Sequence, residues 1–368
     1  MINLTLFNQT TIQANNSENM SLKKMKTCAI VSLATVLLLL FQPIKAQYNF
    51  QSLESAIASS SKELGKEYVI LVYKDGKIIF SKSAGEFTPK TQAPIASSSK
   101  WLTAALIMAL VDEGKISLDD KISKYLPVFT KYSKGFITIR HCLSHLTGIE
   151  SEPIKLANII KRGRYNSLEE EIEDFATKKE IVANPGLEFR YSNVGMNIAG
   201  RLIEVATRRS FEQLMQEKIL RPLQMRSTNF SSLNAINPSG GAQSTANDYM
   251  NFCSMLLNKG MFNGKRILSE ASVQLLMQAQ TTSSMIKYAP KSAEGYNYAL
   301  GSWILQTDQN GNAAVLACPG LFGTWPMIDL CRKYAVVFFV KQFLSEEKKE
   351  VYLKLKGLID EQIVANCN

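Results

Sequence analysis

The strand-like segments of this 368-residue chain lie near its two ends, and helix-like sequence separates them. Residues 67–85 form two β-rich runs around Asp75-Gly76, a dipeptide typical of a tight hairpin turn. Four short runs of strand-forming residues follow one another late in the chain, at 298–306, 313–318, 325–329 and 334–340. The pattern predicts an α+β fold in which both ends of the chain build one antiparallel sheet flanked by helices. An all-helical lobe, at roughly 103–295, would be inserted between the two groups of strands.

The segment at 101–116 is apolar on nearly every side, so it should form a helix buried in the core. The other expected helices are short ones within 117–129 and 137–149, and amphipathic ones at 50–57, 201–220, 246–259 and 346–363. A cleft between the sheet and the helical lobe would be the default binding site.

Residues 21–46 have the pattern of a secretory signal. Three lysines precede the apolar run at 28–41, and small or aliphatic residues before Gln47 suit cleavage there. We therefore expect a polar leader, a signal peptide ending at residue 46 and a mature domain at 47–368 that is periplasmic or secreted and not inserted in the membrane. The alternative is an uncleaved anchor, because the run is strongly apolar.

The composition is that of a globular protein, with 46% hydrophobic and 20% charged residues. Removing residues 1–46 takes away four Lys and one Glu, which leaves 38 basic and 31 acidic residues and a net charge of +7. The excess is spread along the chain and forms no basic stripe, so we expect no nucleic-acid partner. The expected partner is a small-molecule or peptide substrate.

The hexapeptide IASSSK occurs twice, at 57–62 and 95–100, and each copy has a serine three residues before a lysine. In the second copy, Ser97 stands where the core helix should begin, and there the helix dipole favours negative charge on a substrate. Lys100 lies on the same helix face, and its apolar neighbours should lower its pKa. The pair could therefore form an activated serine nucleophile. The alternative is a serine-rich cap on a core helix, which the spacing alone leaves open.

The first copy lacks these features. Ser59 should lie at the C-terminal end of its helix, where the dipole has the wrong sign, and Lys62 should face solvent. Three further Ser-x-x-Lys spacings, which begin at Ser21, Ser284 and Ser345, also lack a following buried helix and are taken as coincidence.

The tripeptide Tyr-x-Asn also occurs twice. Tyr249 and Asn251 fall inside an amphipathic helix and are interpreted as structural. Tyr191 and Asn193 should lie on a loop, where a tyrosine beside an ammonium group could act as a general base. An asparagine two residues later could bond both the lysine and a substrate amide.

Taken in order, Ser97-x-x-Lys100 and Tyr191-x-Asn193 resemble motifs of the serine β-lactamase and penicillin-binding protein superfamily, in the class C-like branch that includes esterases and D-aminopeptidases. The resemblance covers most of 67–345, with further similar segments at 117–127, 137–149, 189–204 and 240–252. It implies a β-lactamase/DD-peptidase-like fold and chemistry without a cofactor.

The resemblance also implies a role for each matching residue. Ser97 would be the acylated nucleophile, Lys100 would hold and release its proton, and Tyr191 would act as base and then as acid. The oxyanion hole would be formed by the backbone N–H of Ser97 and one backbone N–H from the late strand, near Leu321. The residues implied to bind substrate are Asn193, Cys318, Gly320 and Leu321.

The third motif of that family is Lys-Thr-Gly or His-x-Gly, and here it is Cys318-Pro319-Gly320. Gly320 matches, but Cys318 replaces a group that binds a substrate carboxylate in the family. Capture of β-lactams and D-Ala termini should therefore weaken, while the acylating residues remain. Pro319, which lacks an N–H, fits an edge strand that lines a cleft. We expect Cys318 mainly to pack, with a reactive thiol or a disulfide as alternatives.

Five cysteines follow the signal, and Cys318 with Cys331 is the most plausible disulfide, although connectivity cannot be read from sequence. His141 and His145 have the i, i+4 spacing of two metal ligands but no third ligand in pattern, so we expect no metal site. The resemblance implies that His145 is structural. A Ser-His-Asp hydrolase is disfavoured, because the chain has no Gly-x-Ser-x-Gly elbow.

The sequence thus predicts an exported serine hydrolase that forms an acyl-enzyme on Ser97 and hydrolyses an amide or ester. Esterase, D-amino-acid peptidase and weak β-lactamase activities all fit. One alternative is a catalytically impaired cleft that binds cell-wall peptides, suggested by Cys318. Another is a transferase, in which an alcohol or amine replaces water.

Overall fold

The computed structural model describes residues 48–153, 162–230, 234–342 and 347–367. The chain divides into two compact units, 1–48 and 49–368, and every described residue except Tyr48 belongs to the second. The expected signal peptide lies outside the described residues. Among the residues that are described, no helix is long and apolar enough to cross a membrane.

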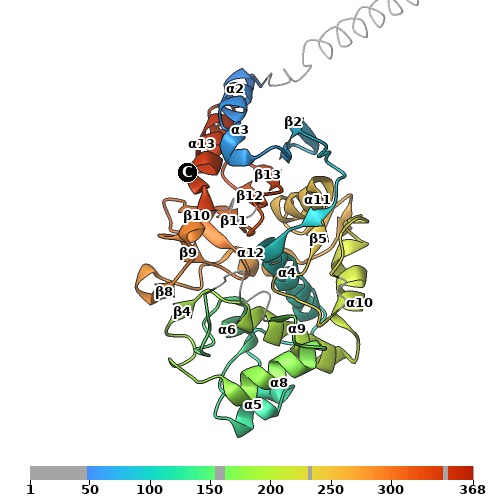
Figure 1. The fold of residues 1–368 in the computed structure, drawn as a ribbon, viewed down its shortest axis with the longest axis vertical. Helices are drawn as coiled ribbons and strands as arrows, with labels where there is room; N and C mark the ends of the chain where they lie inside the picture. Colours follow the sequence, from blue (N-terminus) through green and yellow to red (C-terminus); the bar gives the residue numbers. More distant parts are fainter. Residues whose placement is uncertain (1–47, 154–161, 231–233, 343–346, 368) are drawn as a thin grey trace, which may run out of the picture. The chain divides into compact units, whose positions relative to one another are not determined.

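One antiparallel sheet unites the two ends of the second unit, as predicted (Figure 1). It has seven strands, in the order β2 (Lys77–Ala84), β1 (Tyr68–Lys74), β13 (Tyr334–Val340), β12 (Trp325–Asp329), β11 (Ala313–Ala317), β10 (Trp303–Thr307) and β9 (Asn297–Tyr298). Asp75 and Gly76, at φ 49° and 83°, make the predicted β1–β2 turn. Because β1 pairs with β13, the sheet closes the fold between segments more than 250 residues apart.

Helices cover both faces of this sheet. On one face, α11 (Ala246–Leu257) packs against β1, β12 and β13. On the other, Tyr352 of α13 (Lys349–Asp360) stacks on Trp325 with ring centroids 5.0 Å apart and also contacts Phe338. α13 lies beside α2 (Gln51–Ser59), as Figure 1 shows. Burial on both faces explains why β13 is apolar throughout.

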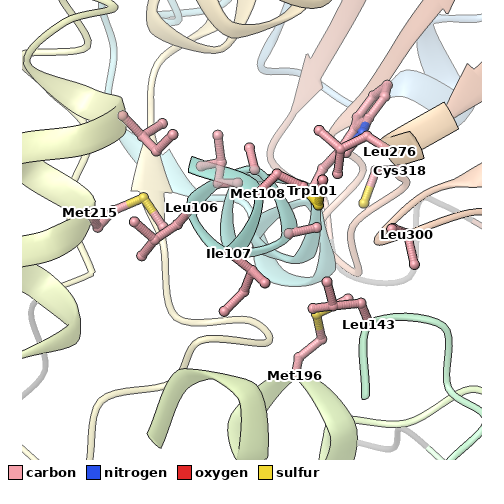
Figure 2. Close-up of a cluster of buried hydrophobic side chains, with 14 of the residues drawn as sticks. Trp101, Leu106, Ile107, Met108, Leu143, Met196, Met215, Leu276, Leu300 and Cys318 are labelled. Carbon is pink, nitrogen blue, oxygen red and sulfur yellow. The ribbon is translucent and has the colours of Figure 1, made fainter. Parts of the chain in front are cut away.

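The predicted core helix is α4 (Ser99–Asp112), in which 12 of the 14 residues are buried. It packs against α9 (Val194–Thr207) and α12 (Glu270–Met277). Figure 2 shows its side chains surrounded by apolar residues of other elements, among them Leu143, Met196 and Leu276. Since α4 is enclosed on all sides, the turn that precedes it is held at a fixed position against the sheet.

Shorter elements complete the described part of the helical insertion. They are α5 (Val128–Lys131), α6 (Ile139–Leu143), α8 (Leu168–Lys178) and α10 (Phe211–Met215), with the small strand pairs β3 (Ala93–Pro94) with β5 (Gln243–Ser244), β4 (Phe189–Arg190) with β8 (Ile286–Tyr288), and β6 (Met261–Phe262) with β7 (Lys265–Arg266).

The expected helix at 201–220 is wrong as one element. α9 ends at Thr207, and the capping residue that follows, Arg208, has a left-handed φ of 58°. Ser210 then starts α10 with a capping box to Gln213, and a π-helical turn follows at 216–220. The sequence contains the pattern of a new helix start here, because Ser210 is followed three residues later by Gln213, as in a capping box.

The expected strand at 298–306 is likewise divided, into β9 and β10. Gly301 lies between them at φ 82°, and a Cβ there would come within 2.7 Å of Ala104 Cβ and 2.9 Å of the Lys100 carbonyl oxygen. The glycine therefore lets this end of the sheet approach α4 closely.

The predicted disulfide between Cys318 and Cys331 is wrong. Cys331 pairs with Cys367, and Cys318 is a free, buried cysteine. The packing of α13 on the sheet returns the C-terminal tail to the β12–β13 turn, where Asn366 N–H also donates to the Cys331 carbonyl. This return depends on tertiary packing, so the spacing of the cysteines does not reveal it.

Candidate active site

The second IASSSK forms a short 3-10 turn, Ala96–Ser98, that leads into α4. Ser98 and Ser99 hold the turn in place. Ser98 Oγ donates to the Cys318 carbonyl oxygen at 2.7 Å, and Ser99 Oγ accepts from the Ala242 N–H at 3.0 Å. Ala96, just before Ser97, has a φ of 43°, which is a strained conformation for a residue with a side chain. Ser97 is left half-buried, with its side chain directed to Lys100.

The second Tyr-x-Asn is structural, as predicted, and it supports the same turn. Tyr249 is fully buried in α11, and its hydroxyl donates to the Ser98 carbonyl oxygen at 2.7 Å. The first IASSSK differs as expected, since Ser59 ends α2 and Lys62 is exposed.

Lys100 is fully buried, and its ammonium nitrogen meets three oxygen atoms. Nζ lies 3.2 Å from Ser97 Oγ, 3.0 Å from Asn193 Oδ1 and 2.9 Å from the Ser239 carbonyl oxygen. Burial lowers the pKa of Lys100 to about 7. The neutral amine is therefore present at physiological pH.

The three contacts orient that neutral amine. A neutral amine has two N–H donors and one lone pair. Asn193 Oδ1 and the Ser239 carbonyl oxygen can only accept, so each takes one N–H. The lone pair then faces Ser97 Oγ, whose hydroxyl is the contact that can donate a proton. The arrangement suits proton transfer from Ser97 to Lys100.

Asn193 holds the position before the first residue of α9, yet its side chain makes no cap bond to the helix. Ser192 Oγ accepts from the Val194 N–H instead, at 3.3 Å. The amide of Asn193 is thus directed to Lys100, as predicted for a residue that bonds the lysine.

Tyr191 is buried, and its ring centroid lies 5.0 Å from Lys100 Nζ. Its backbone N–H donates to the Tyr288 carbonyl oxygen at 3.1 Å, which ties the loop to β8. The structure therefore brings the Tyr191 ring beside Lys100, which itself contacts Ser97, although 94 residues separate the tyrosine from Ser97 in the sequence.

His145 supports the Tyr191 loop. Its ring packs against the Tyr191 ring with centroids 4.6 Å apart, and its Nδ1 accepts from the Ser192 N–H at 3.4 Å. Its Nε2 lies 3.1 Å from the Tyr298 hydroxyl. Burial lowers the pKa of His145, and the Lys100 charge lowers it further, so the ring is neutral at pH 7.

His141 has a different task, because its Nδ1 accepts from the Thr138 N–H at the start of α6. In the part of the chain that the structure describes, no cluster of three His, Cys, Asp or Glu side chains could hold a metal ion.

Cys318 packs against the catalytic turn, as expected, and its burial does not support the substrate-binding role that the resemblance implies. The thiol is buried and lies 3.3 Å from the carbonyl oxygens of both Ser97 and Gly301. The Cys318 N–H donates to the Pro326 carbonyl, and the Cys318 carbonyl accepts from Ser98. All its polar groups are therefore bonded inside the protein. Burial raises the pKa of the thiol to about 12, so it is not a reactive thiolate.

Pro319 lies two residues after Ala317, the last residue of β11 that is paired in the sheet. The prediction of an edge strand is wrong, because β11 lies between β10 and β12. Pro319 is tolerated since it stands beyond the paired part of the strand.

Gly320 and Leu321 lie in the tight turn between β11 and β12. The Gly320 N–H donates to the Thr324 carbonyl oxygen and the Gly323 N–H to the Gly320 carbonyl, both at 2.8 Å. A Cβ on Gly320 would lie 2.2 Å from the Ile95 carbonyl oxygen, so only glycine allows this turn to reach the nucleophile turn.

Neither the Leu321 N–H nor the Ser97 N–H has an acceptor among the described residues. Both donors are therefore candidates for the oxyanion hole that the resemblance implies. The predicted site residues thus gather around one turn, with Cys318 as packing rather than contact.

The Ser239 carbonyl is a partner of Lys100 that no sequence pattern predicts. A backbone oxygen leaves no residue-type signal, and only the similarity of the adjacent segment 240–252 pointed to this region.

A half-buried serine, a buried amine and a tyrosine on this sheet-and-helix framework define a protein of the β-lactamase and penicillin-binding-protein-like serine hydrolase class. The sequence pattern of the family described as Beta-lactamase matches residues 66–359. The chain therefore belongs to the Beta-lactamase family.

Solved structures of that class share the fold. A candidate β-lactamase of Bacteroides dorei is 30% identical, with a TM-score of 0.76 over 86% of this chain and 99% of its own. EstCE1, a hydrolase with promiscuous acyltransferase activity, is 21% identical, with a TM-score of 0.70 over 84% of this chain and 98% of its own. The second likeness shows the fold alone.

Among curated proteins, Protein flp of Staphylococcus aureus (strain MW2) is 32% identical over 177 residues. The match covers 45% of this chain and 35% of that relative, so it spans about a third of the relative's length.

Proposed function

We propose that the protein is an exported serine hydrolase that acylates Ser97 with an ester or amide and then releases the acyl group to water. The observation that carries the proposal is the set of contacts around Lys100, because they direct the lone pair of a neutral amine at Ser97 Oγ. The lowered pKa of Lys100, about 7, supplies that neutral amine at working pH.

In this mechanism Ser97 Oγ gives its proton to Lys100 and attacks the substrate carbonyl. The developing oxyanion accepts from the N–H groups of Ser97 and Leu321. The proton then passes by way of Tyr191 to the leaving alcohol or amine, and the C–O or C–N bond breaks. A water molecule attacks the acyl-enzyme, and Ser97 recovers its proton as the carboxylic acid leaves.

The proposed substrate is an ester or a neutral amide that lacks a carboxylate near the scissile bond. The residue at the start of the third motif, Cys318, is uncharged and fully engaged inside the protein. It therefore offers no ionic partner to the carboxylate of a β-lactam or a D-Ala terminus. The disulfide between Cys331 and Cys367 supports export, because such bonds persist in oxidising compartments.

A fluorophosphonate probe tests the proposal directly. We expect the folded wild-type protein to be labelled, Ser97→Ala to lose labelling, and Ser59→Ala, in the other IASSSK copy, to keep it. Labelling that persists in Ser97→Ala would reject this nucleophile. A folded wild-type protein that no fluorophosphonate or penicillin probe labels would favour a non-catalytic binding cleft.

A substrate screen tests the specificity. Turnover of neutral p-nitrophenyl esters should exceed that of a chromogenic cephalosporin and of D-alanyl-D-alanine peptides. A preference for the carboxylate-bearing substrates would contradict the assignment made from Cys318.

A further inference from the structure

A chain of buried polar residues lies behind the Ser239 carbonyl that contacts Lys100. The Ser239 N–H donates to Asn197 Oδ1 at 3.0 Å. Asn197 Nδ2 in turn lies 3.2 Å from each carboxylate oxygen of Glu171. Ser239 and Asn197 are fully buried, and Glu171 is 2% exposed.

Arg162 closes this chain with a two-point ion pair. Its Nε and Nη2 donate to the two carboxylate oxygens of Glu171 at 2.9 and 2.6 Å. The same guanidinium donates to the carbonyl oxygens of Ala235 and Ile236, at 2.9 and 2.6 Å. Arg162 thus fixes one end of the segment 235–239 directly and, through Glu171 and Asn197, the other end.

The network permits only one orientation of the Asn197 amide. The Glu171 carboxylate accepts from Arg162 and therefore requires the Nδ2 group of Asn197 on its side. Oδ1 must then face the Ser239 N–H. Burial raises the pKa of Glu171, while Arg162 and Asn197 oppose that effect, and the paired geometry is that of a carboxylate held by a guanidinium.

Stability alone does not account for such a group, because a buried ion pair rarely gains more from its attraction than it loses by desolvation. The network ends at the carbonyl that takes one N–H of Lys100. We propose that Arg162, Glu171 and Asn197 are positioning residues for acyl transfer: they hold the Ser239 carbonyl against Lys100 and so keep the amine's lone pair directed at Ser97. The inference rests on the proposed acylation of Ser97.

Loss of this support has two measurable effects. The amine can turn away from Ser97, so the maximal acylation rate falls. The ammonium form loses one acceptor, which lowers the pKa of Lys100 further, so the acidic limb of the rate profile moves to lower pH. Among the described residues, the other titratable groups that face Lys100 are Tyr191, His145 and Cys318, and the variants below leave them in place.

The test measures single-turnover acylation by a p-nitrophenyl ester across pH 5 to 9, with unfolding temperature as a check of folding. Asn197→Leu removes the acceptor of the Ser239 N–H. Glu171→Gln keeps the shape of the side chain but replaces one carboxylate oxygen by an amide nitrogen. That nitrogen cannot accept a hydrogen bond from the donors of Arg162 or Asn197. In both variants we expect the rate plateau to fall about tenfold and the limb to move to lower pH.

Glu204→Gln is the matched control, because Glu204 lies on α9, the helix that also carries Asn197. Glu204 accepts from Arg201 and from the Phe211 N–H, on a path that does not lead to Ser239. We expect its plateau and limb to match those of the wild type.

The inference is overturned if folded Asn197→Leu and Glu171→Gln keep the wild-type profile. The inference is also overturned if the rate plateau of these variants falls while the acidic limb stays in place, because a general loss of packing would lower the plateau in the same way. If Asn197→Leu does not fold, Glu171→Gln decides. A wild-type protein that is not acylated would instead reject the proposed function, and the inference with it.

Discussion

Lys100 Nζ lies 3.0 Å from Asn193 Oδ1, so a helix in the core and the start of another, 93 residues apart, share one buried amine. The same Nζ contacts Ser97 Oγ at 3.2 Å. Because Asn193 makes no cap bond to its own helix, its amide serves the lysine. The orientation of the amine thus depends on a neutral acceptor at position 193.

Replacing that acceptor by a carboxylate should slow acylation at neutral pH. In Asn193→Asp, the negative charge beside Lys100 stabilises the ammonium and raises its pKa from about 7. More of the lysine is then protonated at pH 7, so the acidic limb of the rate profile moves to higher pH. The rate at pH 7 should fall by about 100-fold.

Asn251→Asp, in the second Tyr-x-Asn, is the control for that change. The Asn251 side chain donates to the Leu223 carbonyl and has no contact with Lys100 among the described residues. Its pH profile should match the wild type. An unshifted limb in Asn193→Asp would contradict the assignment of the limb to Lys100.

Gly320→Ala should disable the site by steric contact. The added Cβ would lie 2.2 Å from the Ile95 carbonyl oxygen and 3.0 Å from Ser98 Oγ, so the β11–β12 turn must move away from the nucleophile turn. Moving the Leu321 N–H out of reach should reduce acylation about 100-fold. Labelling by a fluorophosphonate at several times measures this rate.

Gly357→Ala is the matched control for the glycine change. Gly357 lies in α13 with no atom within 4 Å of an added Cβ, so the substitution should keep activity and stabilise the helix by about 0.5–1 kcal/mol. Full activity in Gly320→Ala would show that the turn does not contribute to catalysis.

Burial of Lys100 should make the protein more stable at alkaline pH. Its pKa is about 7 when folded and 10.5 in its ordinary state, so between these values the unfolded chain binds more protons. The free energy of unfolding must then rise with pH, by up to about 1.4 kcal/mol per pH unit. Denaturant unfolding at pH 7, 8 and 9 measures the slope.

The pH range between about 7 and 10.5 distinguishes the effect of Lys100 from the effects of His145 and Cys318. The lowered pKa of His145 acts below the ordinary value of 6.5, and the raised pKa of Cys318 acts above 9.0. Lys100→Met should remove most of the rise and leave the part due to Lys134, whose pKa is also lowered by burial. Lys62→Met, at the exposed lysine of the first IASSSK, should keep the full rise. An undiminished slope in Lys100→Met would assign the effect to other groups.

The bond between Cys331 and Cys367 closes a loop with a sequence separation of 36 residues. Replacing both cysteines by serine should lower the free energy of unfolding by about 3–4 kcal/mol, chiefly because the unfolded chain becomes freer. Acylation of Ser97 at 25 °C should not change, since neither cysteine contacts the site. Non-reducing peptide mapping should show Cys331 linked to Cys367, and a link to Cys318 would contradict the structure.

The predictions from sequence were strongest where one local pattern suffices. The runs at 325–329 and 334–340 are strands with those bounds, because β-rich segments between turn residues have few other choices. The Asp75-Gly76 turn and the enclosed helix after Ser97 are equally local. The break at Arg208 was missed, although Ser210 and Gln213 carry the pattern of a new helix start.

Local sequence patterns do not predict the contacts that complete the site. Cys318 matched a substrate-binding position of the family motif, but its thiol bonds to backbone atoms of the core. Ser239 acts through a carbonyl group that every residue possesses. The Arg162, Glu171 and Asn197 network joins three separate segments, so it exists only after α8 and α9 have packed.

Local patterns were enough to predict the fold class and the choice of Ser97 over Ser59, because turn chemistry and apolar periodicity belong to short stretches of sequence. The grouping of Lys100 with Tyr191 and Asn193 came from the resemblance of their two motifs to the family. The bond between Cys331 and Cys367 and the Ser239 carbonyl as an acceptor for the Lys100 amine follow from the folded structure alone. Those outcomes depend on contacts between segments far apart in the chain. Such contacts are set by how buried faces pack together, which no single stretch of sequence contains.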